Sequence, residues 1–427
     1  MPAVAQPAFA IAVFLITYAI IISEKIHRTI ISLFGAFVLV VCGVMTHEMA
    51  IEAIDFNVIG LLVGMMLIVG LTKDSGVFEY AAVGLAKLGQ GRPVFILIAL
   101  SLMTAVLSGF LDNVTMVLLV VPVTISIAEL LEVDPIPLVF SEVIFSNIGG
   151  TSTLIGDPPN ILIGSSAGLG FLDFVVNLGP VLLVVSGLTI AVICLIFRRR
   201  LAVSDESRQR LMAMDAREQL KDAKLAKQTI AVLGLTVLGF VTHQFWHLES
   251  ASVAMMGASL LLLVVRPDPE KVFNHVEWPV IFFFIGLFIL VGAIEAVGVI
   301  EWLAIQAVAL TGGQMVPTGM AILWVSAIAS AFVDNIPFTA TMIPIIHNLG
   351  QLAAFESLDP LWWSLALGAC LGGNGTLIGA SANVVASGIL EERGYRLSFL
   401  RFMVLGFPLM LLSIAISSLY LYVFYLI

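Results

Sequence analysis

Long apolar stretches, separated by short polar loops, run through most of the chain. Because a helix needs about 20 mostly apolar residues to cross a bilayer, this pattern predicts an all-α, polytopic membrane protein. The first stretch has no Lys or Arg before it, unlike a secretory signal peptide, so we expect it to be retained as a span. Stretches without Asp, Glu, Lys or Arg cover residues 9–23, 30–45, 58–71, 175–197, 230–245, 251–265, 280–291 and 402–427.

The chain also contains an internal repeat. Residues 111–122, LDNVTMVLLVVP, match residues 333–344, VDNIPFTATMIP, at an offset of 222 residues. Residues 149–160, GGTSTLIGDPPN, match residues 372–383, GGNGTLIGASAN, at an offset of 223, and seven of these twelve positions are identical. Ordered matches at a nearly constant offset indicate a duplicated fold. We therefore expect a first repeat over 1–197, a linker over 198–228 and a second repeat over 229–427.

The positions of the charged residues predict how the two repeats face. Only 11% of the residues are charged, and nine of the 19 Lys and Arg lie in 198–227, the one long polar segment. We expect five transmembrane helices and one re-entrant hairpin in each repeat, which makes the second repeat inverted. Every Lys and Arg then falls on the side of the linker. The positive-inside rule places that side in the cytoplasm and both termini outside.

Two polar segments interrupt the apolar pattern, one in each repeat. A helix break inside a membrane is tolerated only where it lines a cavity, and paired broken helices in inverted-repeat transporters mark the substrate site near the midplane. We expect discontinuous helices at 147–160 and at 372–383. The substrate-binding candidates in these breaks are Asn147, Gly149, Gly150, Thr151 and Thr153 in the first repeat, and Gly372, Gly373, Asn374 and Thr376 in the second.

An Asp-Asn pair also interrupts a long apolar run in each repeat. Asp and Asn favour turns because their side chains bond nearby backbone groups, so each pair predicts the tip of a re-entrant hairpin that reaches the same mid-membrane region. The substrate-binding candidates at these tips are Asn113, Thr115, Asn335 and Thr339.

Four carboxylates within apolar segments have two interpretations. An intramembrane carboxylate is a functional hypothesis, here as a carrier of a coupling ion or a proton. Asp112 and Asp334 have the alternative of capping the second arm of each hairpin. Asp157 stands opposite Ala380 in the repeat, so the shared scaffold does not require it, and it either caps the following half-helix or holds the coupling ion. Glu142, ahead of the first break, is a further proton-carrier candidate.

The remaining chemistry in the chain argues against a cofactor or an enzyme. The three cysteines, Cys42, Cys194 and Cys370, stand apart without metal-ligand or disulfide spacing. No Ser-His or metal-ligand arrangement indicates catalysis. The basic linker is better explained as a cytoplasmic connection between membrane halves than as a nucleic-acid surface. We expect no metal, no cofactor, no nucleic-acid partner and no enzymatic activity.

The two Asp-Asn segments and the two Gly-Gly segments resemble the ion transporter superfamily. The resemblance is strongest to ArsB-type arsenite/antimonite permeases and their relatives, the melanosomal P protein and the NhaD-like sodium/proton antiporters. The dicarboxylate branch has Ser-Asn-Thr at both tips, whereas this chain has Asp-Asn, which argues against a sodium-coupled dicarboxylate carrier.

This resemblance implies an elevator-type fold and a function. Scaffold helices before about residue 90 and before about residue 310 would each precede a mobile transport portion. The implied function is export of arsenite or antimonite across the inner membrane, driven by the proton gradient or the membrane potential. A soluble ATPase docked on the linker and a homodimer are further implications. The alternative is a sodium/proton antiporter or another small-anion carrier of the same superfamily.

Overall fold

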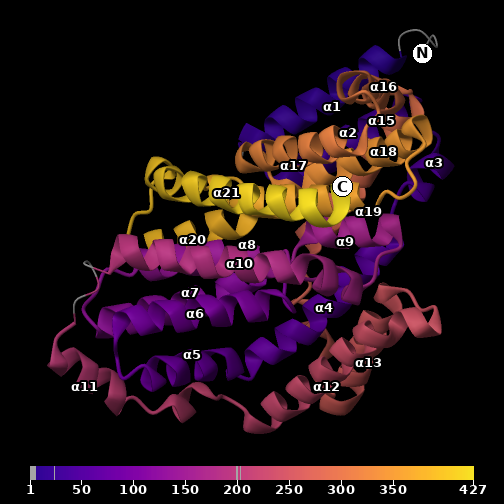
Figure 1. Ribbon diagram of the computed structural model, residues 1–427. Helices are drawn as coiled ribbons and strands as arrows, with labels where there is room; N and C mark the ends of the chain where they lie inside the picture. Colours follow the sequence, from indigo (N-terminus) through magenta and orange to yellow (C-terminus); the bar gives the residue numbers. More distant parts are fainter. Residues whose placement is uncertain (1–5, 24, 199–200, 202) are drawn as a thin grey trace.

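The computed structural model describes residues 6–23, 25–198, 201 and 203–427. Within these ranges the chain is built from helices joined by turns and loops, without β-strands (Figure 1). The N-terminal residues 1–5 and two of the basic linker residues, Arg199 and Arg200, lie outside the described residues.

The main helices of the two halves follow each other in the same order. The first half contains α1 (Gln6–Ser23), α2 (Arg28–Val41), α4 (Phe56–Asp74), α5 (Val77–Leu88), α6 (Pro93–Ser108), α7 (Asn113–Leu130), α8 (Ile136–Gly150), α9 (Pro158–Ala167) and α10 (Phe171–Phe197). The second half contains α12 (Ala223–Thr242), α13 (Ser250–Val265), α15 (Trp278–Ala296), α16 (Val299–Thr311), α17 (Met315–Phe332), α18 (Asn335–Ala353), α19 (Asp359–Gly372), α20 (Ser381–Glu392) and α21 (Phe399–Leu421).

Shorter elements complete the correspondence. The connecting helix α3 (His47–Glu52) has its counterpart in α14 (Pro269–Phe273), and α11 (Asp205–Ala213) lies in the linker. Eight helices in the described residues are long and apolar enough to cross a membrane, and they include α1, α4 and α10 with their counterparts α12, α15 and α21. The other two, α7 and α17, are arms of the hairpins α6–α7 and α17–α18.

Contacts between α10 and α21 show that the halves face opposite ways. At one end of this helix pair, the Tyr425 hydroxyl, just beyond α21, donates to Asn177 Oδ1 of α10 at 2.6 Å. At the other end, Phe140 of α8 packs edge-on against both Phe197, the last residue of α10, and Phe402, near the start of α21. The start of α10 therefore lies beside the end of α21, and the two counterpart helices run antiparallel (Figure 1). The repeats are inverted, as the sequence predicted.

Small residues allow the first helices of the two halves to pack crosswise, α2 on α15 and α4 on α13. A Cβ on Gly64 of α4 would lie 2.7 Å from the carbonyl carbon of Ala254, and one on Gly286 of α15 would lie 2.7 Å from that of Ser32. These distances are too short for any larger side chain, so both glycines serve close helix packing. The first arm of each hairpin packs on the helix that leads into its own break, α6 on α8 and α17 on α19.

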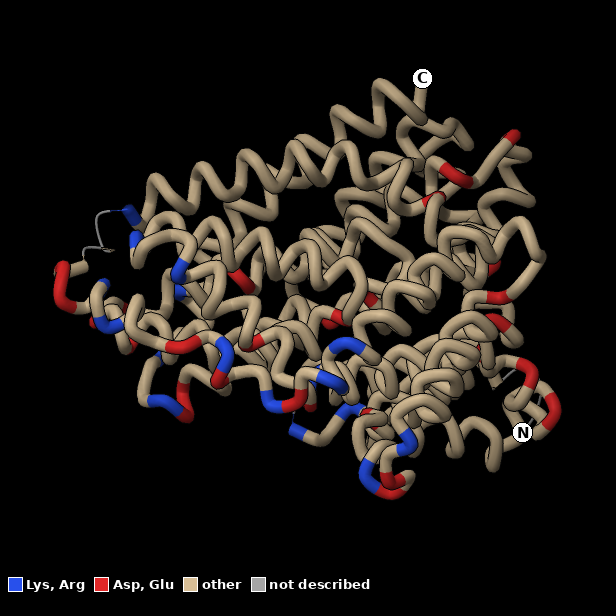
Figure 2. Tube along the Cα trace, turned by 90° about the horizontal axis from the view of Figure 1, so that it is seen from below, with Lys and Arg blue, Asp and Glu red and all other residues tan. Residues whose placement is uncertain are grey.

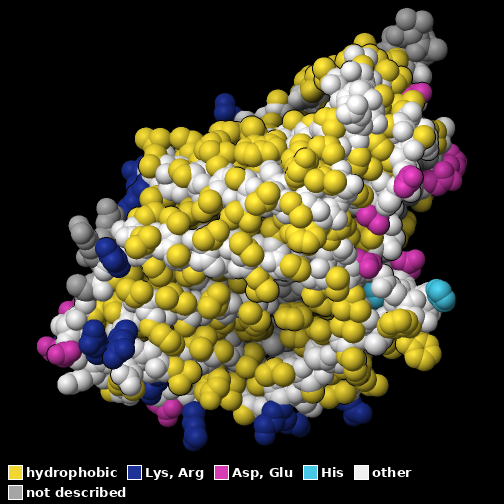
Figure 3. Space-filling view, viewed as in Figure 1, with side chains coloured by type: hydrophobic (Ala, Val, Ile, Leu, Met, Phe, Trp, Pro, Cys, Tyr) yellow, Lys and Arg dark blue, Asp and Glu magenta, His cyan; other side chains and the backbone are white. Residues whose placement is uncertain are grey.

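The surface separates into an apolar middle and charged edges. Large apolar side chains such as Leu183, Leu195 and Leu310 are more than 60% exposed, as expected for a lipid-facing belt. Lys and Arg gather at the left and lower edges of the molecule, whereas its right-hand end carries Asp and Glu (Figures 2 and 3). This separation follows the bias that the sequence predicted for the loops.

Candidate functional site

Each hairpin turns at its Asp-Asn pair. Asp112 Oδ1 accepts a hydrogen bond from the Thr115 backbone N–H at 2.9 Å, and Asp334 Oδ1 accepts one from the Ile336 N–H at 3.0 Å. Both aspartates are therefore N-caps, of α7 and α18. The capping role considered for them exists in both halves.

Threonines in the breaks join the two tips to the broken helices. Thr153 Oγ1 donates to the Gly109 carbonyl at 2.5 Å, at the end of the first hairpin arm. Its counterpart Thr376 donates in the same way to the Ala331 carbonyl of α17. Each break therefore lies directly against the tip of its own hairpin.

The breaks fall between α8 and α9 and between α19 and α20. Carbonyl groups freed by the breaks accept bonds from two further counterpart side chains, Asn160 and Asn383. Asn160 Nδ2 donates to the carbonyls of Thr151 and Thr153 at 3.0 and 2.8 Å, and Asn383 Nδ2 donates to those of Gly373 and Thr376 at 2.8 and 2.9 Å. Because an unsatisfied backbone group inside a membrane costs several kcal/mol, these asparagines make the unwound segments tolerable.

Asn147 joins the two broken helices at the centre of the molecule. Its Nδ2 donates to Asn374 Oδ1 at 2.9 Å and to Asn383 Oδ1 at 3.1 Å, and its Oδ1 accepts from Asn113 Nδ2 at 3.1 Å. All four side chains are buried. A network of carboxamides therefore brings together three of the predicted site residues, from the first tip and from both breaks.

Asp157 lies between the two hairpin tips. The residue is completely buried and precedes Pro158 at the start of α9, but its side chain makes no cap bond there. Its Oδ1 instead accepts from both Asn113 Nδ2 and Asn335 Nδ2 at 3.3 Å, and its Oδ2 lies 3.3 Å from the same Asn335 nitrogen. A buried charge requires compensation, and here it comes from two amides and the positive end of α9. A proton or a small cation would complete it.

A small cavity adjoins this carboxylate. Its walls come from α2, α4, both hairpin tips, the start of α9, α15 and α20, and the space inside is about 30 Å³. That space admits one or two water-sized guests. The side chains that carry charge or hydrogen-bonding groups into it are Arg28, Asp112, Asn113, Asp157, Glu277, Asn335 and Ser381.

Several predicted residues lie outside this lining. Gly149 faces the Ala105 backbone of α6, and Gly372 faces the Ala327 backbone of α17. Gly150 and Gly373 face the stretches of chain that leave the breaks, at Gly156 and Gly379. The close approach at these four glycines is thus to neighbouring backbone, and it places the breaks tightly against the hairpins.

Three further predicted residues have separate environments. Thr115 occupies the first turn of α7. The buried Thr339 hydroxyl on α18 has no hydrogen-bond partner among the described residues. Glu142 is buried in α8, away from the cavity, with Oε1 accepting from Thr124 Oγ1 at 2.5 Å. Its Oε2 has no partner within the described part of the chain, which leaves that oxygen available to a proton.

Comparisons with known proteins agree with this transporter-like arrangement. Residues 18–368 match the model of the citrate transporter family, CitMHS. The chain belongs to the citrate transporter family. An uncharacterised transporter of Mycobacterium tuberculosis (strain H37Rv) is 42% identical over 97% of this chain and 98% of its own length. The 46 kDa membrane protein of Mycobacterium leprae is 40% identical over 98% of this chain and 99% of its own.

Two more distant relatives bear on the expected superfamily. The human P protein is 36% identical over 98% of this citrate transporter family member and 60% of its own length, which confirms the expected relation to P protein. The YdaH transporter of Alcanivorax borkumensis has the same fold, with a TM-score of 0.61 at 14% identity, over 93% of this chain and 98% of that one. The ion transporter fold expected from the sequence is confirmed.

The site of this citrate transporter family member also contains residues that the sequence did not single out. Arg28 and Glu277 lie at the starts of helices, and in the sequence their charges indicated only positions at the edge of the membrane. Nothing in the sequence around Ser381 indicated a role in the site. Asn160 and Asn383 did carry one. They are the last identical pair of the Gly-Gly repeat, and identity at an asparagine inside an apolar repeat indicates a hydrogen bond that both copies need.

Proposed function

We propose that the protein is a secondary active transporter in which a proton or a sodium ion binds Asp157 and is exchanged or cotransported across the membrane. The observation that supports this most directly is the buried carboxylate between Asn113 and Asn335. Carboxylate oxygens are ligands that small hard cations prefer, and the two amides hold this carboxylate in place through their N–H groups. Of the functions considered from the sequence, the sodium/proton antiporter fits this buried carboxylate best.

The charges around the cavity weigh against free citrate as its occupant. Three carboxylates, Asp112, Asp157 and Glu277, line the cavity with a single guanidinium, that of Arg28. A tricarboxylate would meet like charges at low dielectric, where repulsion is strong. The small space, about 30 Å³, fits an ion better than a six-carbon acid in this conformation.

Arsenite or antimonite is the second candidate substrate. It is mainly a neutral trihydroxide at neutral pH, and the amide-rich surroundings of Asn113, Asn147 and Asn335 suit a small neutral hydroxyl ligand. Export would then be driven by the proton gradient or the membrane potential. The soluble ATPase on the linker and the homodimer belong to this second proposal.

The placement in the membrane is proposed as well. We place the linker in the cytoplasm and both termini outside the inner membrane, supported by the gathering of Lys and Arg on one side of the molecule. We also propose elevator-type movement of the hairpins and broken helices against the first helices of each half. The packing of each first hairpin arm against its own broken helix, α6 on α8 and α17 on α19, supports it.

Purified protein in liposomes tests these proposals together. With a pH-sensitive dye inside, a sodium gradient should change the internal pH in vesicles that contain the protein and not in protein-free vesicles. Parallel uptake of radiolabelled arsenite and citrate ranks the cargoes. If the sodium gradient leaves the internal pH unchanged while arsenite accumulates, the second proposal replaces the first. Uptake of citrate alone would contradict both proposals.

A further inference from the structure

A second cavity opens beside the central one. It has a volume of about 330 Å³ and lies between the α1–α2 connection, the tip of the α17–α18 hairpin and α20. Most of its wall is apolar, from residues such as Ile26, Phe332 and Val384. Two of its lining residues, Arg28 and Ser381, also line the central cavity. The two spaces are therefore neighbours that share one wall.

A cluster of three side chains forms that wall. Arg28 Nη1 lies 2.7 Å from Asp334 Oδ2 and donates to Ser381 Oγ at 2.7 Å, while Ser381 Oγ donates to the same Asp334 oxygen at 2.8 Å. The Arg28 guanidinium also stacks 5.0 Å from the centre of the Phe283 ring. The ion pair is largely buried, with 24% of the Arg28 and 15% of the Asp334 side chain exposed. Such charge-assisted bonds are strong, and these connect α2 to a hairpin tip and to a half-helix.

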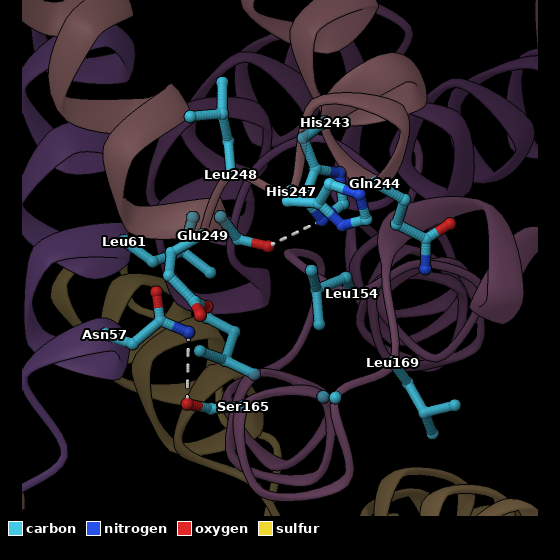
Figure 4. Close-up of a pocket in the computed structure, with 14 residues that line it drawn as sticks. Asn57, Leu61, Leu154, Ser165, Leu169, His243, Gln244, His247, Leu248 and Glu249 are labelled. Atoms are coloured by element: carbon cyan, nitrogen blue, oxygen red, sulfur yellow. Dashed lines mark hydrogen bonds between the residues drawn. The ribbon is translucent and has the colours of Figure 1, made fainter.

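A third cavity, also of about 330 Å³, is the counterpart of the second (Figure 4). At an offset of 222 residues, Ile21, Ile26 and Arg28 correspond to His243, Leu248 and Ser250, which line this third cavity. In it, Asn57 Nδ2 donates to Ser165 Oγ at 3.1 Å, and Ser250 contacts His243 Nε2 at 3.4 Å (Figure 4). The third cavity shares no lining residue with the central one.

The repeat shows that the ion pair is particular to one side. Arg28 corresponds to Ser250, and Ser381 corresponds to Pro158. Asp112, the counterpart of Asp334, forms no ion pair within the described residues. The second cavity thus meets the central one at a polar cluster, whereas the third cavity shares no wall with it and is lined by buried apolar side chains such as Leu61 and Ile161.

We propose that Arg28, Asp334 and Ser381 form a gate, and that the second cavity is the vestibule through which a monovalent cation reaches Asp157 from the α1–α2 side. In the closed gate Arg28 keeps a positive charge between the vestibule and the carboxylate. Opening the gate turns Arg28 aside and exposes Asp334, whose carboxylate then attracts the entering cation. This inference rests on the proposed function, because the gate serves the cation site.

Cysteine accessibility tests the gate without requiring transport. Met66→Cys places a thiol in the central cavity, and Val384→Cys places one in the vestibule. Both changes are made in a protein that also carries Cys42→Ser and Cys194→Ser. The same protein without an added cysteine gives the background reaction of the buried Cys370, which is subtracted. Vesicles that expose the α1–α2 connection are treated with Ag⁺, a thiol-binding monovalent cation small enough for the central cavity, and the reaction rates are measured from the thiols that a maleimide can still label after denaturation.

The gate predicts a selective change. With Arg28→Gln, the thiol of Met66→Cys should react at least about tenfold faster. This factor corresponds to the stability that one charge-assisted hydrogen bond gives to the closed gate. The thiol of Val384→Cys, in the vestibule, should react within about twofold of its former rate. Asp334→Asn should give the same result, because asparagine still caps α18, so it serves if Arg28→Gln folds poorly. Equal Met66→Cys rates with and without either change would overturn the gate. A normal gating response in a protein that moves no cation would contradict the proposed function alone.

Discussion

Replacing the Asp157 carboxylate by a carboxamide should abolish cation-coupled transport while leaving the protein folded. Asp157→Asn keeps the volume of the side chain, and its Oδ1 still accepts hydrogen bonds from Asn113 and Asn335. The change therefore removes one negative charge and the second contact of Asn335, at Oδ2. Because the aspartate side chain makes no cap bond to α9, the start of that helix should not loosen.

The expected loss follows from the interaction between two unit charges. A cation held about 4 Å from the carboxylate gains about 4 kcal/mol at an effective dielectric constant of about 20. That energy corresponds to a loss of about a thousandfold in cation affinity. Partial compensation by the carboxamide oxygen reduces it, so we expect the sodium concentration for half-maximal exchange to rise at least about a hundredfold.

Sodium-driven pH changes in liposomes measure this loss, with Glu301→Gln as the matched control. Glu301 is an exposed carboxylate in the first turn of α16, so its replacement removes the same charge far from the cavity. The control should transport like the unchanged protein. Exchange by Asp157→Asn with unchanged sodium and pH dependence would refute the role of this carboxylate and leave it as a structural group.

Three further substitutions test residues of α8. Asn147→Ala removes three side-chain hydrogen bonds worth about 1 kcal/mol each, so the melting temperature of the purified protein should fall by several degrees. The control Asn348→Ala removes a single local hydrogen bond and should lower the melting temperature less. Gly149→Ala brings a Cβ against the Ala105 backbone and should destabilise the α6–α8 contact by about 1–3 kcal/mol, while Gly84→Ala, made where the space is open, should not lower the melting temperature. Glu142→Gln keeps an oxygen that accepts the hydrogen bond from Thr124. If Glu142 relays protons, this change should slow proton-coupled transport at least about tenfold. An unchanged transport rate would show that Glu142 has a structural role.

The sequence predicted the fold well because the fold depends on patterns that repeat. Apolar stretches, the 222-residue offset and the one-sided Lys and Arg required the inverted arrangement that α10 and α21 confirm. The breaks were also predictable, since a cluster of glycine, proline and polar residues frees backbone groups that lipid cannot satisfy. Their boundaries shifted by a few residues because helical geometry continues through Gly150 and Gly372.

The site was harder to predict from the sequence than the fold. The sequence named Asn113, Asn147, Asp157 and Asn335 because they lie in helix breaks and hairpin tips within apolar segments, and the structure brings these four residues together. Arg28 was not named, because a basic residue at the start of a membrane helix fits the positive-inside rule without any further role. Its contact with Asp334 joins residues 306 positions apart, a separation that no local pattern reports.

The comparison of the two repeats separates structural residues from directional ones. Side chains present in both copies do the same structural work twice, as Thr153 and Thr376 do in closing the hairpin tips. A carrier built only from such pairs would have the same groups on both access routes, and nothing in its site would distinguish one side from the other. Under the proposed function, the direction and the ion coupling would therefore come from side chains present in one copy. In this chain three of them line the central cavity, with Asp157 opposite Ala380, Arg28 opposite Ser250, and Ser381 opposite Pro158.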